Sequence, residues 1–101
     1  MAHLDVYPMP GGARCGYVVD VQANLLAGLA TRAVVPADEG RDSAIGGCWP
    51  QPVFSIKGQR HVLLTQGIAA VPARELREAV GSLLDQRETI LRALDLLLTG
   101  V

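Results

Sequence analysis

The chain has 101 residues, of which 50% are hydrophobic, 19% charged and 4% aromatic, and its formal net charge is −1. This length favours one domain spanning residues 1–101, large enough to bury about two thirds of its unfolded surface. The apolar runs are far shorter than the ~20 residues of a membrane helix and no signal peptide is evident, so we expect a cytoplasmic protein. Scattered arginines and a near-neutral charge argue against a stand-alone nucleic-acid binder.

Short β-rich segments bounded by proline and glycine occupy the first two thirds of the chain. Residues 4–7 predict a first strand. Residues 17–22 (YVVDVQ) predict the clearest strand, because β-branched side chains alternate between its two faces. Residues 32–36 (RAVVP) predict another strand, closed by its final proline. The segments at 52–56 and 61–66 flank the turn sequence KGQR, so we expect them to pair as an antiparallel hairpin.

The last third of the chain has a helical period. Residues 74–80 predict a helical turn, and a longer helix is predicted over about residues 83–99. Ser82, followed three positions later by Asp85, resembles a capping box at its start. Leu96 is expected to point with the polar residues. The apolar face is predicted to hold Leu83, Leu84, Arg87, Ile90, Leu91, Leu94, Leu97 and Leu98. The patterns together predict an α+β fold, mainly antiparallel β, with five or more strands and one C-terminal helix.

No residue pattern predicts catalysis, a cofactor or a metal site. Residues 11–16 lack the Gly-Lys-Ser/Thr ending of a phosphate-binding loop, which favours a turn. Cys15 with His61 as base is conceivable, but a small apolar role for Cys15 and an exposed strand position for His61 are favoured. Cys15 and Cys48 have no CxxC spacing and are expected to remain thiols. Asp20 could be either a hydrogen-bonded structural group or a contact to a partner.

The end of the predicted helix breaks a local rule. Helix C-termini favour cations, yet Asp95 and the chain's own carboxylate lie there with no lysine or arginine in the last turn. The simplest role for Gly100 is a left-handed cap. Leu96 on the polar face and the apolar Val101 nevertheless indicate a surface that another protein covers.

Several segments, in this order along the chain, resemble the CcdB family of toxins. The likeness extends over nearly the whole length and is weakest in residues 8–16 and 37–49. The segments that carry it are YVVDVQANLL, RAVVP, the Val71-Pro72 pair and a C-terminal helix ending in Gly-Val. The stretch VDVQ and the terminal glycine with its aliphatic neighbour are the most specific of these.

The resemblance implies an SH3-like barrel of the CcdB/MazF type with a C-terminal helix, assembled as a homodimer. CcdB-like toxins are not enzymes. They bind the A subunit of DNA gyrase and trap its complex with cleaved DNA. A CcdA-like antitoxin neutralises the toxin, and the toxin–antitoxin complex binds operator DNA and represses its own operon. The resemblance therefore implies a topoisomerase poison of a type II toxin–antitoxin system.

The resemblance also implies a set of gyrase-binding residues. These are Leu25, Leu26, Asp95, Leu98, Thr99, Gly100 and Val101. Leu98 stands where the family carries an aromatic residue and Asp95 where it carries an amide. Thr99 occupies the place of a tryptophan that the plasmid-type toxin inserts into gyrase. Losing a buried tryptophan of this kind costs about 2 kcal/mol or more, or upward of ~30-fold in affinity.

Two alternatives remain open from the sequence. The first is a CcdB-like protein with weak or lost gyrase poisoning that acts mainly as an antitoxin-binding and repressor component, and Thr99 motivates it. The second is a MazF-like endoribonuclease on the same fold, which would need a basic groove and a positioned acid–base pair. The scattered arginines and slightly acidic net charge argue against the ribonuclease.

Overall fold

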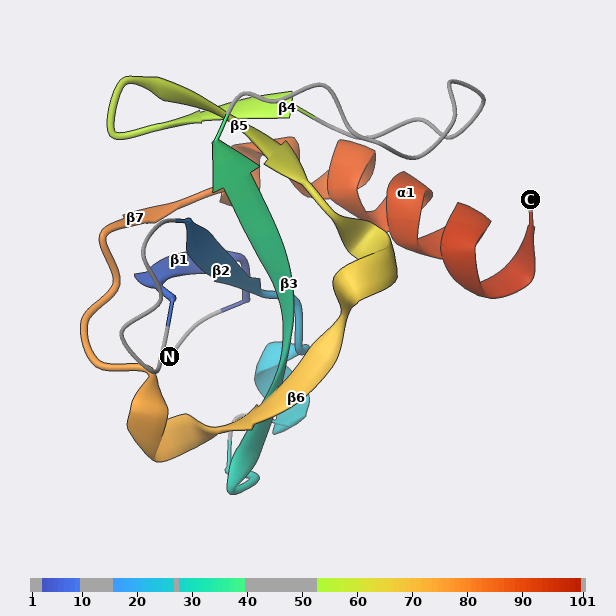
Figure 1. Cartoon of the computed structure of the whole chain (residues 1–101). Coiled ribbons are helices and arrows are strands. Elements are labelled where there is room, and N and C mark those ends of the chain that lie inside the picture. Colours follow the sequence, from blue (N-terminus) through green and yellow to red (C-terminus); the bar gives the residue numbers. More distant parts are fainter. Residues whose placement is uncertain (1–2, 10–15, 27, 40–52, 101) are drawn as a thin grey trace.

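The computed structural model describes residues 3–9, 16–26, 28–39 and 53–100. Within these ranges the chain forms an antiparallel, nearly closed barrel-like sheet with one α-helix, as expected for an α+β SH3-like barrel (Figure 1). The strands are β1 (Asp5–Pro8), β2 (Tyr17–Asp20), β3 (Thr31–Glu39), β4 (Val53–Ile56), β5 (Gln59–Leu63), β6 (Ala69–Pro72) and β7 (Gly81–Ser82). The helix is α1 (Arg87–Thr99), and short 3-10 turns lie at η2 (Asn24–Leu26), η3 (Thr65–Gly67), η4 (Ala73–Glu75) and η5 (Leu84–Gln86).

The long strand β3 organises the sheet, whose order is β4-β5-β3-β2-β1-β7, with β6 also paired to β3. Residues 31–34 of β3 pair with β6 and residues 37–39 pair with β5. The prediction that this strand ends at Pro36 is therefore wrong. The Pro36 carbonyl accepts the Leu64 N–H at 2.9 Å. The missing N–H of this proline thus faces the gap between β5 and β6, where the ladder needs no donor.

The predicted hairpin is confirmed. Strands β4 and β5 pair antiparallel, with Ile56 opposite Gln59 across a two-residue turn. Lys57 and Gly58 at the turn have φ angles of 53° and 78°. Positive φ at both central residues is the pattern of the type I′ turn, whose twist matches that of the flanking strands.

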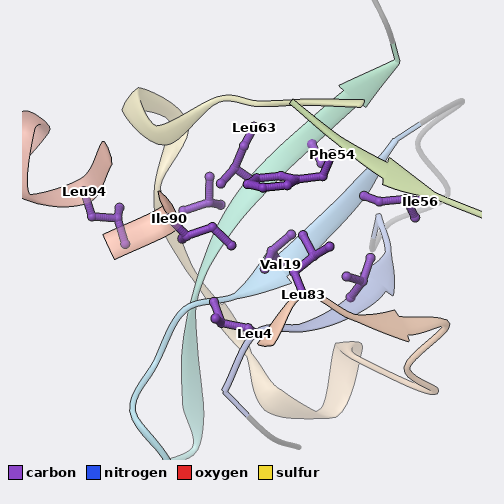
Figure 2. Packing of buried hydrophobic residues seen from close by; sticks show 11 residues of the cluster. Leu4, Val19, Phe54, Ile56, Leu63, Leu83, Ile90 and Leu94 are labelled. Carbon is purple, nitrogen blue, oxygen red and sulfur yellow. The ribbon is translucent and has the colours of Figure 1, made fainter. Parts of the chain in front are cut away.

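The main core fills the space between the sheet and α1 (Figure 2). Its buried side chains are Leu4, Val6, Val19, Val35, Ala37, Phe54, Ile56, Leu63, Leu83, Ile90 and Leu94. The predicted alternation of β2 is confirmed, because Val19 enters this core whereas Val18 lies in a second cluster with Tyr7, Val34 and Leu76. Leu76 belongs to the segment after β6. That segment forms only the turn η4 and then runs without helix to β7, so the expected helical turn over residues 74–80 is reduced to Ala73–Glu75.

The helix α1 begins four residues later than predicted, after the turn η5. Ser82 Oγ accepts the Leu84 N–H at 3.2 Å at the start of η5, whereas the N-cap of α1 is Gln86 and makes no side-chain cap, so the capping box predicted at the helix start is not found at α1. The buried residues of α1 are Ile90, Ala93 and Leu94. Leu84, Arg87 and Leu98, predicted on the apolar face, are exposed instead. Leu84 lies in η5, before α1 begins, and Leu98 lies in the last turn of α1, which extends beyond the sheet (Figure 1). In the described part of the chain, no helix is long and apolar enough to cross a membrane.

Candidate functional site: an exposed leucine patch and the helix end

Three leucines are exposed in the segment between β2 and β3. Leu25 is 92% exposed, Leu29 is 52% exposed and Leu26 is 46% exposed. We call these residues the leucine patch. The turn η2, which carries two of them, has no buried residue. Large apolar side chains exposed together on a small protein are typical of a surface that binds another macromolecule. Leu25 and Leu26 were expected here from the resemblance, whereas Leu29 was not.

The patch is joined to the fold by hydrogen bonds. The Gln22 side chain donates from Nε2 to the Leu26 carbonyl at 2.9 Å, and its Oε1 accepts the Ala33 N–H at 3.0 Å. On the other side of the turn, the His3 N–H donates to Asn24 Oδ1 at 2.8 Å. The turn is therefore tied both to β3 and to the residues that precede β1.

A buried ion pair lies beneath this segment. Asp20 of β2 and Arg32 of β3 are both fully buried, and Asp20 Oδ2 accepts Arg32 Nε at 2.8 Å and lies 2.6 Å from Nη2. The other carboxylate oxygen, Oδ1, accepts the Gln22 N–H at 3.0 Å. Of the two roles left open for Asp20, the structure places it in the structural one. Burial, with smaller contributions from Asp5 and Asp20, also raises the pKa of the nearby Tyr7 above its ordinary value.

The second exposed surface is the end of α1. Asp95, Leu98, Thr99 and Gly100 are all exposed, with Leu98 exposed to 70%. Gly100 has a φ of 78°, and its N–H donates to the Leu96 carbonyl at 3.0 Å, so the expected left-handed cap is confirmed. The Thr99 hydroxyl donates to the Asp95 carbonyl at 2.8 Å. Val101 lies outside the described residues.

The leucine patch and the helix end are separate within one chain. Figure 1 shows η2 beside the start of β3, whereas the end of α1 extends to a different side of the molecule. The six described residues among the seven implied by the resemblance therefore form two groups, with Leu25 and Leu26 in one and Asp95, Leu98, Thr99 and Gly100 in the other. A single partner surface can cover both only if it is large or if two copies of the chain come together.

His61 differs from the sequence expectation. It is buried rather than exposed, its Nδ1 lies 2.9 Å from the Gln59 carbonyl, and its ring contacts Tyr17 edge-on at a centroid distance of 5.2 Å. Nδ1–H is the donor to that carbonyl, which leaves Nε2 without a partner among residues 3–9, 16–26, 28–39 and 53–100. Cys15 and Cys48 lie outside these ranges. Within them, no three His, Cys, Asp or Glu side chains gather as metal ligands do.

The fold defines a small barrel protein of the SH3-like class, and its surface exposes large apolar side chains. The sequence model of the CcdB protein family matches residues 3–100, and the chain therefore belongs to the CcdB family. Its place in that family makes it a toxin of a toxin–antitoxin system, with an antitoxin as its partner. No curated protein matches the chain significantly.

Proposed function

We propose that this toxin binds the A subunit of DNA gyrase and traps the gyrase–DNA cleavage complex, acting by binding rather than by catalysis. The observation that carries the proposal is Leu25, a large apolar side chain 92% exposed at the position of the paired aliphatic residues that contact gyrase in the family. A fully exposed leucine contributes nothing to the core, so its presence is best explained by a partner. Because gyrase works on the chromosome, this activity belongs in the cytoplasm.

The helix end supplies the second contact in this proposal. Leu98 and Gly100 are exposed there, as a docking surface requires. Thr99 lacks the apolar area of a tryptophan, and its hydroxyl is already bonded to the Asp95 carbonyl. We therefore expect gyrase binding to be weaker than in family members that carry tryptophan at this position, by upward of ~30-fold.

A homodimer is part of the proposal. One chain presents the leucine patch and the helix end on different sides, whereas two copies present two of each. Simultaneous engagement of both copies would raise the overall affinity through effective concentration without any new contact. A CcdA-like antitoxin would neutralise the toxin, and the complex of the two would bind operator DNA and repress the operon.

Plasmid cleavage by gyrase in the presence of ATP tests the proposal, with linear DNA as the readout. The wild type should trap cleaved DNA, and Thr99→Trp should trap it at lower protein concentration. Leu25→Ala should weaken trapping. Leu84→Ala is the matched control, because Leu84 is another exposed leucine but lies outside both surfaces. The gyrase proposal is wrong if neither the wild type nor Thr99→Trp yields linear DNA.

Thr99 also favours a second candidate function, in which the chain has lost gyrase poisoning and acts mainly by binding its antitoxin and repressing the operon. In that case Thr99→Trp changes little, while antitoxin binding and operator binding by the complex remain strong. A MazF-like ribonuclease is disfavoured by the scattered arginines and slightly acidic net charge, and by His61, the base considered from the sequence, which is buried against Tyr17. Cleavage of RNA by the purified protein would reinstate it.

A further inference from the structure

We propose that Gln22 is a positioning residue for gyrase binding, whose side-chain amide holds the turn η2 in the shape that presents Leu25 and Leu26. This inference rests on the proposed function, because it assumes that the leucine patch contacts gyrase. It assigns a role to Gln22 as the last residue of the VDVQ stretch. In this role Gln22 does not contact gyrase itself and acts only by holding the turn.

The first step is the bridge that one side chain makes between two segments. Gln22 Nε2 donates to the carbonyl of Leu26, the last residue of η2, at 2.9 Å. Gln22 Oε1 accepts the N–H of Ala33 in β3 at 3.0 Å. The neutral amide of glutamine can do both because it carries a donor and an acceptor on separate atoms. A carboxylate of the same shape could make only the bond to Ala33.

The second step is that the backbone of Gln22 is bonded to the buried Asp20–Arg32 ion pair. The Gln22 N–H donates to Asp20 Oδ1 at 3.0 Å, and the other oxygen of that carboxylate is held by Arg32. Arg32 is the residue before Ala33 in β3. The buried ion pair and the Gln22 amide thus join the same two neighbouring segments at adjacent positions, one inside the fold and one at its surface.

The third step is that little apolar burial holds the turn. No residue of η2 is fully buried, since Leu25 is 92% exposed and Leu26 is 46% exposed. A segment with few buried contacts and exposed backbone bonds opens easily. Besides the Gln22 bridge, the hydrogen bonds of the turn include Leu26 N–H to the Ala23 carbonyl at 2.9 Å, Leu29 N–H to the Leu26 carbonyl at 3.1 Å and His3 N–H to Asn24 Oδ1 at 2.8 Å. When the bridge is absent, gyrase must order the turn as it binds. The free energy of this ordering lowers the affinity.

Two substitutions test the bridge. Gln22→Glu keeps the shape of the side chain but replaces the donor to Leu26 with a second acceptor, and Gln22→Met removes both bonds without adding charge. Gln59→Glu is the matched control for charge, because Gln59 is an exposed glutamine of the β4–β5 hairpin. Each variant is made in the full chain. The urea unfolding midpoint of each Gln22 variant is first compared with that of Gln59→Glu, and the two should agree within experimental error.

The first readout is amide hydrogen exchange in the free protein. Both Gln22 variants should speed exchange at Leu26 and Leu29, whose N–H groups donate to the Ala23 and Leu26 carbonyls, and leave Val19 and Val35 of the core unchanged. The second readout is affinity for purified gyrase A subunit. We expect a loss of about fivefold per toxin chain, the worth of one neutral hydrogen bond, and a double variant with Leu25→Ala should lose less than the product of the single losses.

The outcomes separate this inference from the function it rests on. Faster exchange at Leu26 together with weaker, non-additive gyrase binding supports it. Unchanged exchange overturns the positioning role, whatever gyrase binding shows. Faster exchange with unchanged gyrase affinity overturns the link between the turn and gyrase. If the wild type fails to bind gyrase at all, the proposed function fails, while the exchange result still decides whether Gln22 holds the turn.

Discussion

Replacing Arg32 with an uncharged residue tests how much the buried Asp20–Arg32 ion pair matters for the free energy of unfolding. Arg32→Met keeps much of the side-chain volume but leaves the Asp20 carboxylate buried without its charged partner, while the Gln22 N–H still donates to Oδ1. Breaking a buried pair from one side costs about 3–5 kcal/mol, a large part of the ~5–15 kcal/mol that stabilises a domain of this size. With a urea m-value of about 1.5 kcal/mol per M, the unfolding midpoint should fall by about 2–3 M.

The double variant Asp20→Asn with Arg32→Met decides whether the cost comes from the stranded charge. Asparagine keeps an oxygen for the Gln22 N–H, and neither side chain is then charged. Arg32 Nη1 has no hydrogen-bond partner in the described part of the chain, so the native pair is incompletely satisfied and its joint removal should recover at least half of the loss. All midpoints are compared at one protomer concentration. A loss below about 1 kcal/mol in Arg32→Met, or a double variant as unstable as the single one, would refute the reasoning.

Two further predictions concern the second cluster and the helix. Because the pKa of Tyr7 is raised in the folded state, the stability it contributes is intact below about pH 10 and is lost as the pH rises through the folded pKa. Urea midpoints of Tyr7→Phe should therefore fall less than those of the wild type between pH 9 and pH 11, and equal falls would contradict this. Ile90→Ala should lose about 2–5 kcal/mol in urea unfolding because the side chain is fully buried. Leu98→Ala should stay within about 0.5 kcal/mol, and similar losses for both would mean that the helix packs by another face.

The features that the sequence predicts well are local. The β4–β5 hairpin depends on a glycine two residues from Ile56 and on β-rich segments at either side, and all of this information lies within a short window. The alternation in β2 is local too, since a strand buried on both faces still repeats every two residues. The pattern does not predict which residues cover the second face of β2. Leu76, far along the chain, is one of them.

The features that the sequence does not predict are set by distant pairing. Pro36 predicts the end of a strand. The strand β3 continues past it because the missing N–H lies between the segments of β3 that pair with β6 and with β5. His61 reads as a surface residue beside a turn, yet it is buried because Tyr17 of β2 packs against its ring. Leu98 fits the apolar face of α1 by periodicity. It is exposed because the sheet ends before the helix does, which no property of the helix sequence reveals.

The candidate site illustrates the same division. Leu25 and Leu26 were found through the family resemblance, because a short leucine-containing loop has no period that separates buried from exposed side chains. The role of Gln22 was missed although it lies in the most specific stretch of the sequence. Its two hydrogen bonds reach Leu26 nearby and Ala33 in the next strand, and only the pairing of β2 with β3 brings the second partner into range.

The pairing of β1 with β7 bears on when the toxin becomes complete. Asp5 and Val6 at one end of the described chain lie opposite Ser82 and Gly81 near the other. Closing so long a loop costs conformational entropy before any contact repays it, which slows folding. During synthesis, β1 cannot gain this neighbour, nor the core its contacts with Ile90 and Leu94, until most of the chain has been made. Until β7 and α1 have been made, the nascent toxin therefore has no finished barrel with which to bind a partner.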